Sequence, residues 1–61
     1  MSRMKIKSNR REIKKLISAA VHQISIISDT DTSEPQRVEA AQRLAEIRLR
    51  INLLKDENER L

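Results

Sequence analysis

Basic side chains carry the clearest chemical signal in this sequence. Five of them recur near the N-terminus at spacings that place them on one broad face of a helix: Lys7, Arg10, Arg11, Lys14 and Lys15. Three more would project close together from a second helix: Arg37, Arg48 and Lys55. Phosphates along a nucleic-acid backbone are regularly spaced, and Lys and Arg bind them with release of counterions. The pattern predicts contact between these residues and nucleic acid, with a merely solvated, solubilising surface as the alternative.

The positive charge is concentrated at one end of the chain. Residues 1–15 carry seven basic groups and one acidic group, a balance of +6, whereas residues 16–61 carry six basic and eight acidic groups, a balance of −2. Such an asymmetry favours an anionic partner. Because the sequence has no aromatic residue to stack on bases, a duplex or a folded RNA recognised by its shape fits better than a single strand.

Catalytic and metal-binding patterns are missing from the sequence. Acidic residues precede basic ones by four positions, which is typical of ion pairs on a helix surface: Glu39 with Arg43, Glu46 with Arg50, and Asp56 with Arg60. The chain has no Cys, and its one His, His22, is expected on the solvent-exposed face of the first helix. There is no Gly-rich phosphate loop and no nucleophile–base pair. We therefore expect no enzymatic activity, no metal and no cofactor.

Two helices are needed to position the basic residues. The sequence has no Gly, no aromatic residue and a single Pro, a composition that predicts an all-α chain. Residues 1–9 form a basic N-terminal arm that is either frayed or a helical extension. Asn9 is a candidate cap for a helix over residues 10–28, with Glu12 completing a capping box. An earlier start is favoured by an apolar repeat of seven: Ile6, Ile13, Ala20 and Ile27.

Residues 29–33 are predicted to form the turn, and residues 34–61 the second helix. Asp and Thr disfavour a helix interior, and Ser33 is a candidate N-cap with Gln36 as its capping-box partner. In the first helix the expected apolar stripe comprises Ile13, Leu16, Ile17, Ala20, Val21, Ile24 and Ile27.

The second helix carries two apolar stripes on nearly opposite faces. One is a heptad seam with alternating spacings of four and three: Ala40, Leu44, Ile47, Ile51, Leu54, Asn58 and Leu61. The other comprises Val38, Ala45, Leu49 and Leu53. A single partner helix cannot cover both stripes, so the first helix is expected to cover one of them and a second chain the other. Which stripe packs inside the chain stays open.

The predicted oligomer interface is the seam: Leu44, Ile47, Ile51, Leu54, Asn58 and Leu61. A single Asn in a heptad seam fixes register and strand number, and the expected partner of Asn58 is its equivalent in a second copy. A short loop makes the helices antiparallel neighbours. The predicted fold is therefore an antiparallel helical hairpin that dimerises into a four-helix bundle or a coiled-coil-like assembly.

In length, in its two helices and in its short loop, this architecture resembles the small plasmid-encoded RNA-binding hairpins of the Rop type. Those hairpins dimerise into a four-helix bundle, so the resemblance implies a homodimer. No residue motif is shared, and no residue role is transferred. A bZIP arrangement is excluded because a loop containing Pro35 separates the basic stretch from the heptads.

The predicted function is that of a small non-enzymatic regulator that binds duplex RNA or DNA through the basic face of its first helix. The alternative is a protein–protein interaction module (a small inhibitor, adaptor or oligomerisation domain) that holds a larger protein partner with an apolar helix face. A membrane-surface role is disfavoured because Trp and Phe are absent. No apolar run has the length of a membrane span and no signal peptide is recognisable, so the expected location is the cytoplasm.

Overall fold

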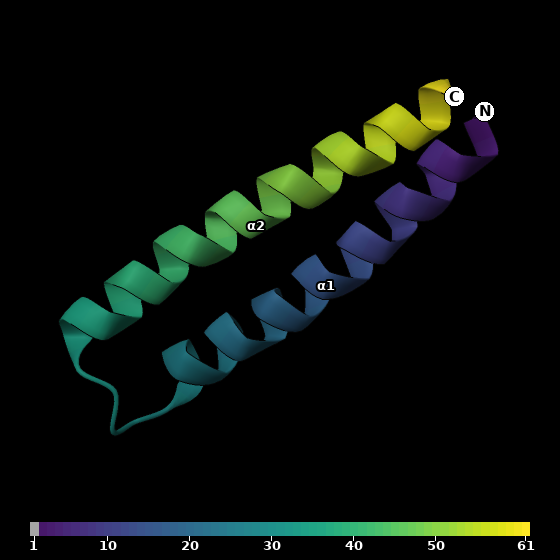
Figure 1. Cartoon of the computed structure of the whole chain (residues 1–61). Helices are drawn as coiled ribbons and strands as arrows, with labels where there is room; N and C mark the ends of the chain where they lie inside the picture. Colours follow the sequence, from purple (N-terminus) through teal and green to yellow (C-terminus); the bar gives the residue numbers. More distant parts are fainter. Residues whose placement is uncertain (1) are drawn as a thin grey trace.

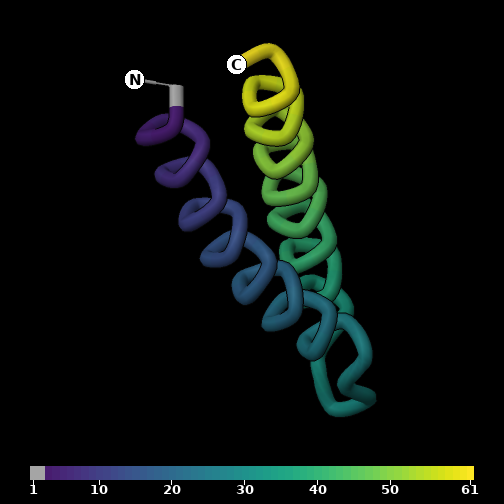
Figure 2. The backbone as a smooth tube through the Cα atoms, turned by 90° about the vertical axis from the view of Figure 1, so that its right-hand side faces the viewer, coloured from purple at the N-terminus to yellow at the C-terminus, as the bar shows by residue number. Residues whose placement is uncertain are grey.

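The computed structural model describes residues 2–61 and consists of two α-helices joined by a turn (Figure 1). Helix α1 spans Ser2–Ser28 and helix α2 spans Glu34–Arg60. The helices run antiparallel, so that the start of α1 lies beside the end of α2 at the end of the molecule opposite the turn (Figure 2). The fold is an all-α helical hairpin whose Cα trace extends 47 × 14 × 10 Å.

The N-terminal arm belongs to α1 over residues 2–9, whereas Met1 lies outside the described residues. The prediction that Asn9 caps a helix is wrong, because Asn9 lies in the second turn of a longer helix and is 2% exposed. Both helices have 27 residues, so neither overhangs the other. The extra turns of α1 cover the end of α2, which a helix beginning at Arg10 would leave in water.

The turn is held by hydrogen bonds within residues 29–37. The Asp29 carboxylate accepts a hydrogen bond from the Asp31 backbone N–H over 2.9 Å, which closes a local Asx turn. Ser33 occupies the N-cap position of α2, and its backbone N–H donates to Gln36 Oε1 over 3.3 Å. Ser33 and Gln36 thus act at the predicted start of the second helix.

The core is a two-stranded antiparallel seam between α1 and α2. Ala40 and Leu54 are each 3% exposed, and Leu44, Ile47 and Ile51 are half-buried between them. From α1, the buried and half-buried positions include a run spaced by three and four: Ile6, Asn9, Ile13, Leu16, Ala20, Gln23 and Ile27. Both helices therefore contribute heptad positions to the seam.

This packing shows which of the two stripes of α2 lies inside the chain. Leu44, Ile47, Ile51, Leu54 and Asn58 face α1 within the same chain, where they are buried or half-buried, rather than lying free for a second chain. Leu61, at the end of the chain, is 49% exposed. The short covalent turn keeps α1 close to α2, so α1 competes for the seam with a lower entropic cost than a separate chain.

Two further sets of apolar residues stay in water. On α1, Ile17, Val21 and Ile24 are 49%, 60% and 49% exposed, although the sequence placed them on the buried stripe. On α2, Val38, Leu49 and Leu53 are 52%, 61% and 52% exposed, and Ala45 between them is also exposed. We call Val38, Ala45, Leu49 and Leu53 the outer stripe. A hairpin of this size leaves much of its apolar surface uncovered.

Candidate functional site

The basic face of α1 is turned away from α2. Its five members are all exposed: Lys7, Arg10, Arg11, Lys14 and Lys15. At about 100° per residue they lie outside the arc that contacts α2. Among residues 3–61, the three ion pairs use Lys5, Arg43 and Arg50 as cations, so the five residues of this face keep uncompensated charge. They are available to an external anion.

The single acidic residue of α1 is turned away from this face. Glu12 is half-buried, and its Oε1 accepts hydrogen bonds from Nε and Nη2 of Arg50 on α2, each over 3.3 Å. The pairing neutralises the one carboxylate that would weaken the positive potential of α1. The outward face of this helix is therefore purely basic or neutral.

The three predicted basic residues of α2 have different surroundings. Arg37 is half-buried, and its Nη2 donates to the Asp29 backbone carbonyl over 3.0 Å, so its guanidinium helps to hold the turn. Arg48 and Lys55 are exposed. They lie on a flank of α2, and the structure does not bring them onto the outward face of α1. The outward face of α1 therefore holds five of the eight predicted residues.

The two flanks of the hairpin differ in charge. On one flank, ion pairs join the helices: Lys5 Nζ lies 3.5 Å from Glu57 Oε1, and Arg50 Nη2 lies 3.3 Å from Glu12 Oε1. We call this side the paired flank. We call the opposite side of the hairpin, across the seam from these ion pairs, the basic flank. Its residues follow from a spacing of about 100° per residue: Arg10, Ile17, Val21 and Ile24 of α1, and Ala41, Arg48, Lys55 and Glu59 of α2.

A polar cluster lies at the end of the seam opposite the turn. Asn9 Nδ2 donates to Asn58 Oδ1 over 2.8 Å and to Glu57 Oε1 over 3.2 Å. The hydrogen bond from Asn9, followed by the nearby charge of Lys5, holds the pKa of the Glu57 carboxyl below its usual value. Asn58 was predicted to face a second copy, but the structure supplies Asn9 of the same chain. An Asn pair at matching levels favours one register of the hairpin.

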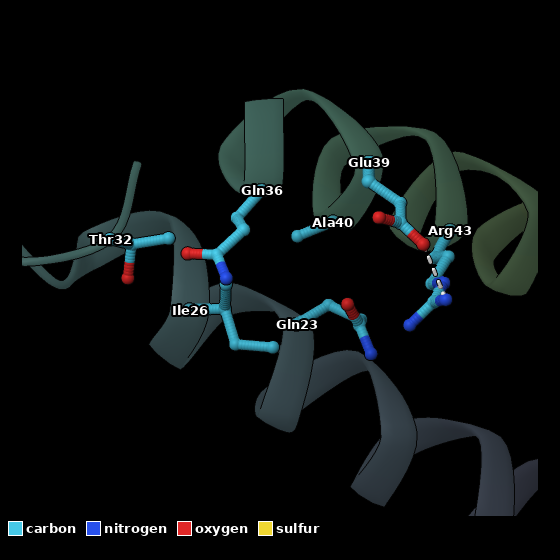
Figure 3. A pocket seen from close by; sticks show the side chains of 7 residues that line it. All are labelled: Gln23, Ile26, Thr32, Gln36, Glu39, Ala40 and Arg43. Carbon is cyan, nitrogen blue, oxygen red and sulfur yellow. Dashed lines mark hydrogen bonds and ion pairs between the residues drawn. The ribbon is translucent and has the colours of Figure 1, made fainter. Parts of the chain in front are cut away.

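A shallow pocket of about 400 Å³ lies on the paired flank near the turn (Figure 3). Gln23 and Ile26 of α1 face Gln36 and Glu39 of α2 across it. Most of its charge is already used, because Arg43 Nη2 donates to Glu39 Oε1. Gln23 is buried, and its Oε1 has no hydrogen-bond partner in the described part of the chain. The pocket therefore offers one spare acceptor and no free charge with which to bind an ion.

The described residues contain neither a cluster of metal ligands nor a membrane-spanning helix. Nowhere in residues 2–61 do three His, Cys, Asp or Glu side chains gather closely enough to hold a metal ion. Neither helix, over its described length, is apolar enough to cross a bilayer. Comparison with models of protein families, with curated proteins and with solved structures gave no match.

Proposed function

We propose that the protein is a small non-enzymatic regulator that binds duplex RNA or DNA through the outward face of α1. The observation that supports this proposal is the set of five exposed basic side chains without ion pairs in residues 3–61. A helix of 27 residues is about 40 Å long, which is enough to follow several phosphates. Binding would be driven by counterion release and would be independent of base sequence.

The expected result of removing this charge is weaker binding with a shallower salt dependence. We would replace Arg10, Arg11, Lys14 and Lys15 by Gln, which is about as good a helix former, so the helix should persist. Each lost phosphate contact lowers the slope of log K against log salt by about 0.9 for duplex DNA, or about 3.6 for four contacts. Titration of labelled duplex DNA and RNA at several salt concentrations measures this slope.

A matched control removes the same charge from other surfaces. Lys5 and Arg43 lie in ion pairs, Lys55 is exposed on a flank of α2, and Arg60 ends α2, so replacing these four by Gln lowers the net charge equally. The control should bind duplex more tightly than the α1 variant at each salt concentration. Equal binding by the two variants would mean that net charge alone acts. A parent protein that binds no duplex even at low salt would contradict the proposal and favour the protein-interaction alternative.

A second copy of the chain is proposed to cover the outer stripe of α2. Val38, Leu49 and Leu53 remain about half-exposed, and the stripe lies nearly opposite the seam that α1 occupies. None of its residues is charged, so two copies can approach along it without like-charge repulsion. Such a dimer would contain four helices and two basic faces, which doubles the charge offered to a duplex.

Sedimentation equilibrium tests this dimer. At micromolar concentration we expect twice the chain mass of 7.1 kDa, and Leu49→Asp should return the mass to that of one chain. Met4→Asp is the matched control, because Met4 is 80% exposed on α1, far from the outer stripe, and the dimer should survive its replacement. A folded parent chain that sediments as a monomer would contradict the dimer.

A further inference from the structure

The basic flank carries an apolar patch that the proposed duplex and the proposed dimer both leave uncovered. Ile17, Val21 and Ile24 follow one another at spacings of four and three along α1, and each is about half-exposed or more. The register that joins Glu12 to Arg50 and brings Gln23 beside Ala40 places Val21 near the level of Ala41, and Ile17 within about one helical turn of the level of Arg48. The patch is therefore continuous with the small Ala41 side chain on α2.

Cations border this patch on both helices. Lys14 lies at its α1 edge and Arg48 at its α2 edge, whereas Arg10 and Lys55 lie farther along the flank toward the end opposite the turn. The acidic partners that neutralise cations elsewhere on the hairpin lie on the paired flank: Glu12 bonds Arg50, and Glu57 bonds Lys5. The paired flank is thus neutralised by its own ion pairs. On the basic flank the apolar patch has Lys14 and Arg48 at its edges, and the acidic Glu59 lies beyond the patch near the end of α2.

We infer that the basic flank binds an acidic amphipathic helix of a partner protein. An apolar stripe on that helix would pack on Ile17, Val21 and Ile24, while carboxylates on either side of its stripe would meet Lys14 and Arg48. Complementary charge on both edges would fix the position of the helix and exclude basic partners. The inference goes beyond duplex binding, because it uses the apolar patch and Arg48, and it shares only Lys14 with the proposed duplex-binding face.

Other occupants fit this flank less well. A second copy of the chain would bring Arg48 and Lys55 against cations of the same flank, and like charges placed opposite one another weaken association. A phosphate backbone would satisfy the cations but would leave Ile17, Val21 and Ile24 without an apolar neighbour. An acidic amphipathic helix satisfies both the apolar patch and its border.

The test uses two synthetic helical peptides of about six turns and the full-length protein. Both peptides carry the same Leu stripe, bordered by Glu in one and by Lys in the other. Calorimetric and NMR titrations should show binding of the Glu peptide, with shifts at Ile17, Val21 and Ile24, and little binding of the Lys peptide. Val21→Glu should weaken the Glu peptide at least about tenfold. Val38→Glu, a matched change at a similarly exposed valine of the outer stripe, should not.

A charge exchange makes the test sharper. Arg48→Glu should weaken the Glu peptide and strengthen the Lys peptide, with helicity confirmed by circular dichroism for each variant. Failure of the parent to bind the Glu peptide, equal binding of the two peptides, or equal loss in Val21→Glu and Val38→Glu would overturn the inference. A Val21→Glu variant that loses its dimer mass would assign the flank to a second copy instead, and one that loses duplex binding would assign it to nucleic acid. Because the peptides are titrated without nucleic acid, failure of duplex binding is distinguishable from failure here.

Discussion

Replacing Leu54 by Ala should destabilise the hairpin by about 2–5 kcal/mol, whereas the same replacement at Leu53 should cost much less at low protein concentration. The two residues are adjacent and identical in type, but Leu54 is buried against α1 and Leu53 is about half-exposed on the outer stripe. Truncating Leu54 removes apolar contacts and leaves a cavity in a seam that has few buried residues. Urea unfolding followed by circular dichroism measures both changes.

Protein concentration separates the two effects. The cost at Leu54 arises inside one chain, so it should be the same at every concentration. The cost at Leu53 should grow with concentration if the outer stripe is covered by a second copy, because dimerisation adds stability by mass action. Equal, concentration-independent costs at Leu53 and Leu54 would contradict the packing of α2, since they would place both residues in the same environment.

Local sequence signals were sufficient for most of the architecture. The turn at residues 29–33 and the start of α2 follow from Ser33 and Gln36, whose hydrogen bond lies within one helical turn. The two apolar stripes of α2 follow from spacing alone. These features depend on residues close together in sequence, which is why the pattern predicts them without knowledge of the packing.

The remaining features depend on how the two helices meet. Asn9 reads as a cap when only its neighbours are considered, and its role in the seam becomes visible only when Asn58 lies beside it. The choice of seam is also non-local, because α1 can face either stripe of α2. Likewise, the basic flank exists because Glu12 turns toward Arg50, so charge counts along the chain do not reveal it. The seam position of Asn9 has a partial signal in the sequence, because Asn9 follows Ile6 by three residues and precedes Ile13 by four.

The hydrogen bond between Asn9 and Asn58 should produce opposite effects in single and double variants. Asn58→Leu removes the acceptor 2.8 Å from the Asn9 amide, and Asn9 is the most buried polar side chain among the described residues. Leaving that donor with only Glu57 should cost about 1–3 kcal/mol, the range measured for unsatisfied buried groups. Asn9→Leu should cost less, because the two acceptors that it leaves, Asn58 Oδ1 and Glu57 Oε1, belong to side chains that are only half-buried and can turn to water.

Asn9→Leu combined with Asn58→Leu should be as stable as the parent or more stable. The double variant replaces a buried polar layer by an apolar one, and removing both partners of a hydrogen bond avoids an unsatisfied group. A double-mutant cycle from urea unfolding should therefore show a coupling energy larger than the experimental error of the unfolding free energies. The double variant should be less destabilised than the sum of the two single variants. If Asn58→Leu alone raised stability, Asn58 would not be bonded to Asn9 within the chain. It would then act as a polar residue between copies, where its loss relieves the cost of burial and loosens the choice of oligomer.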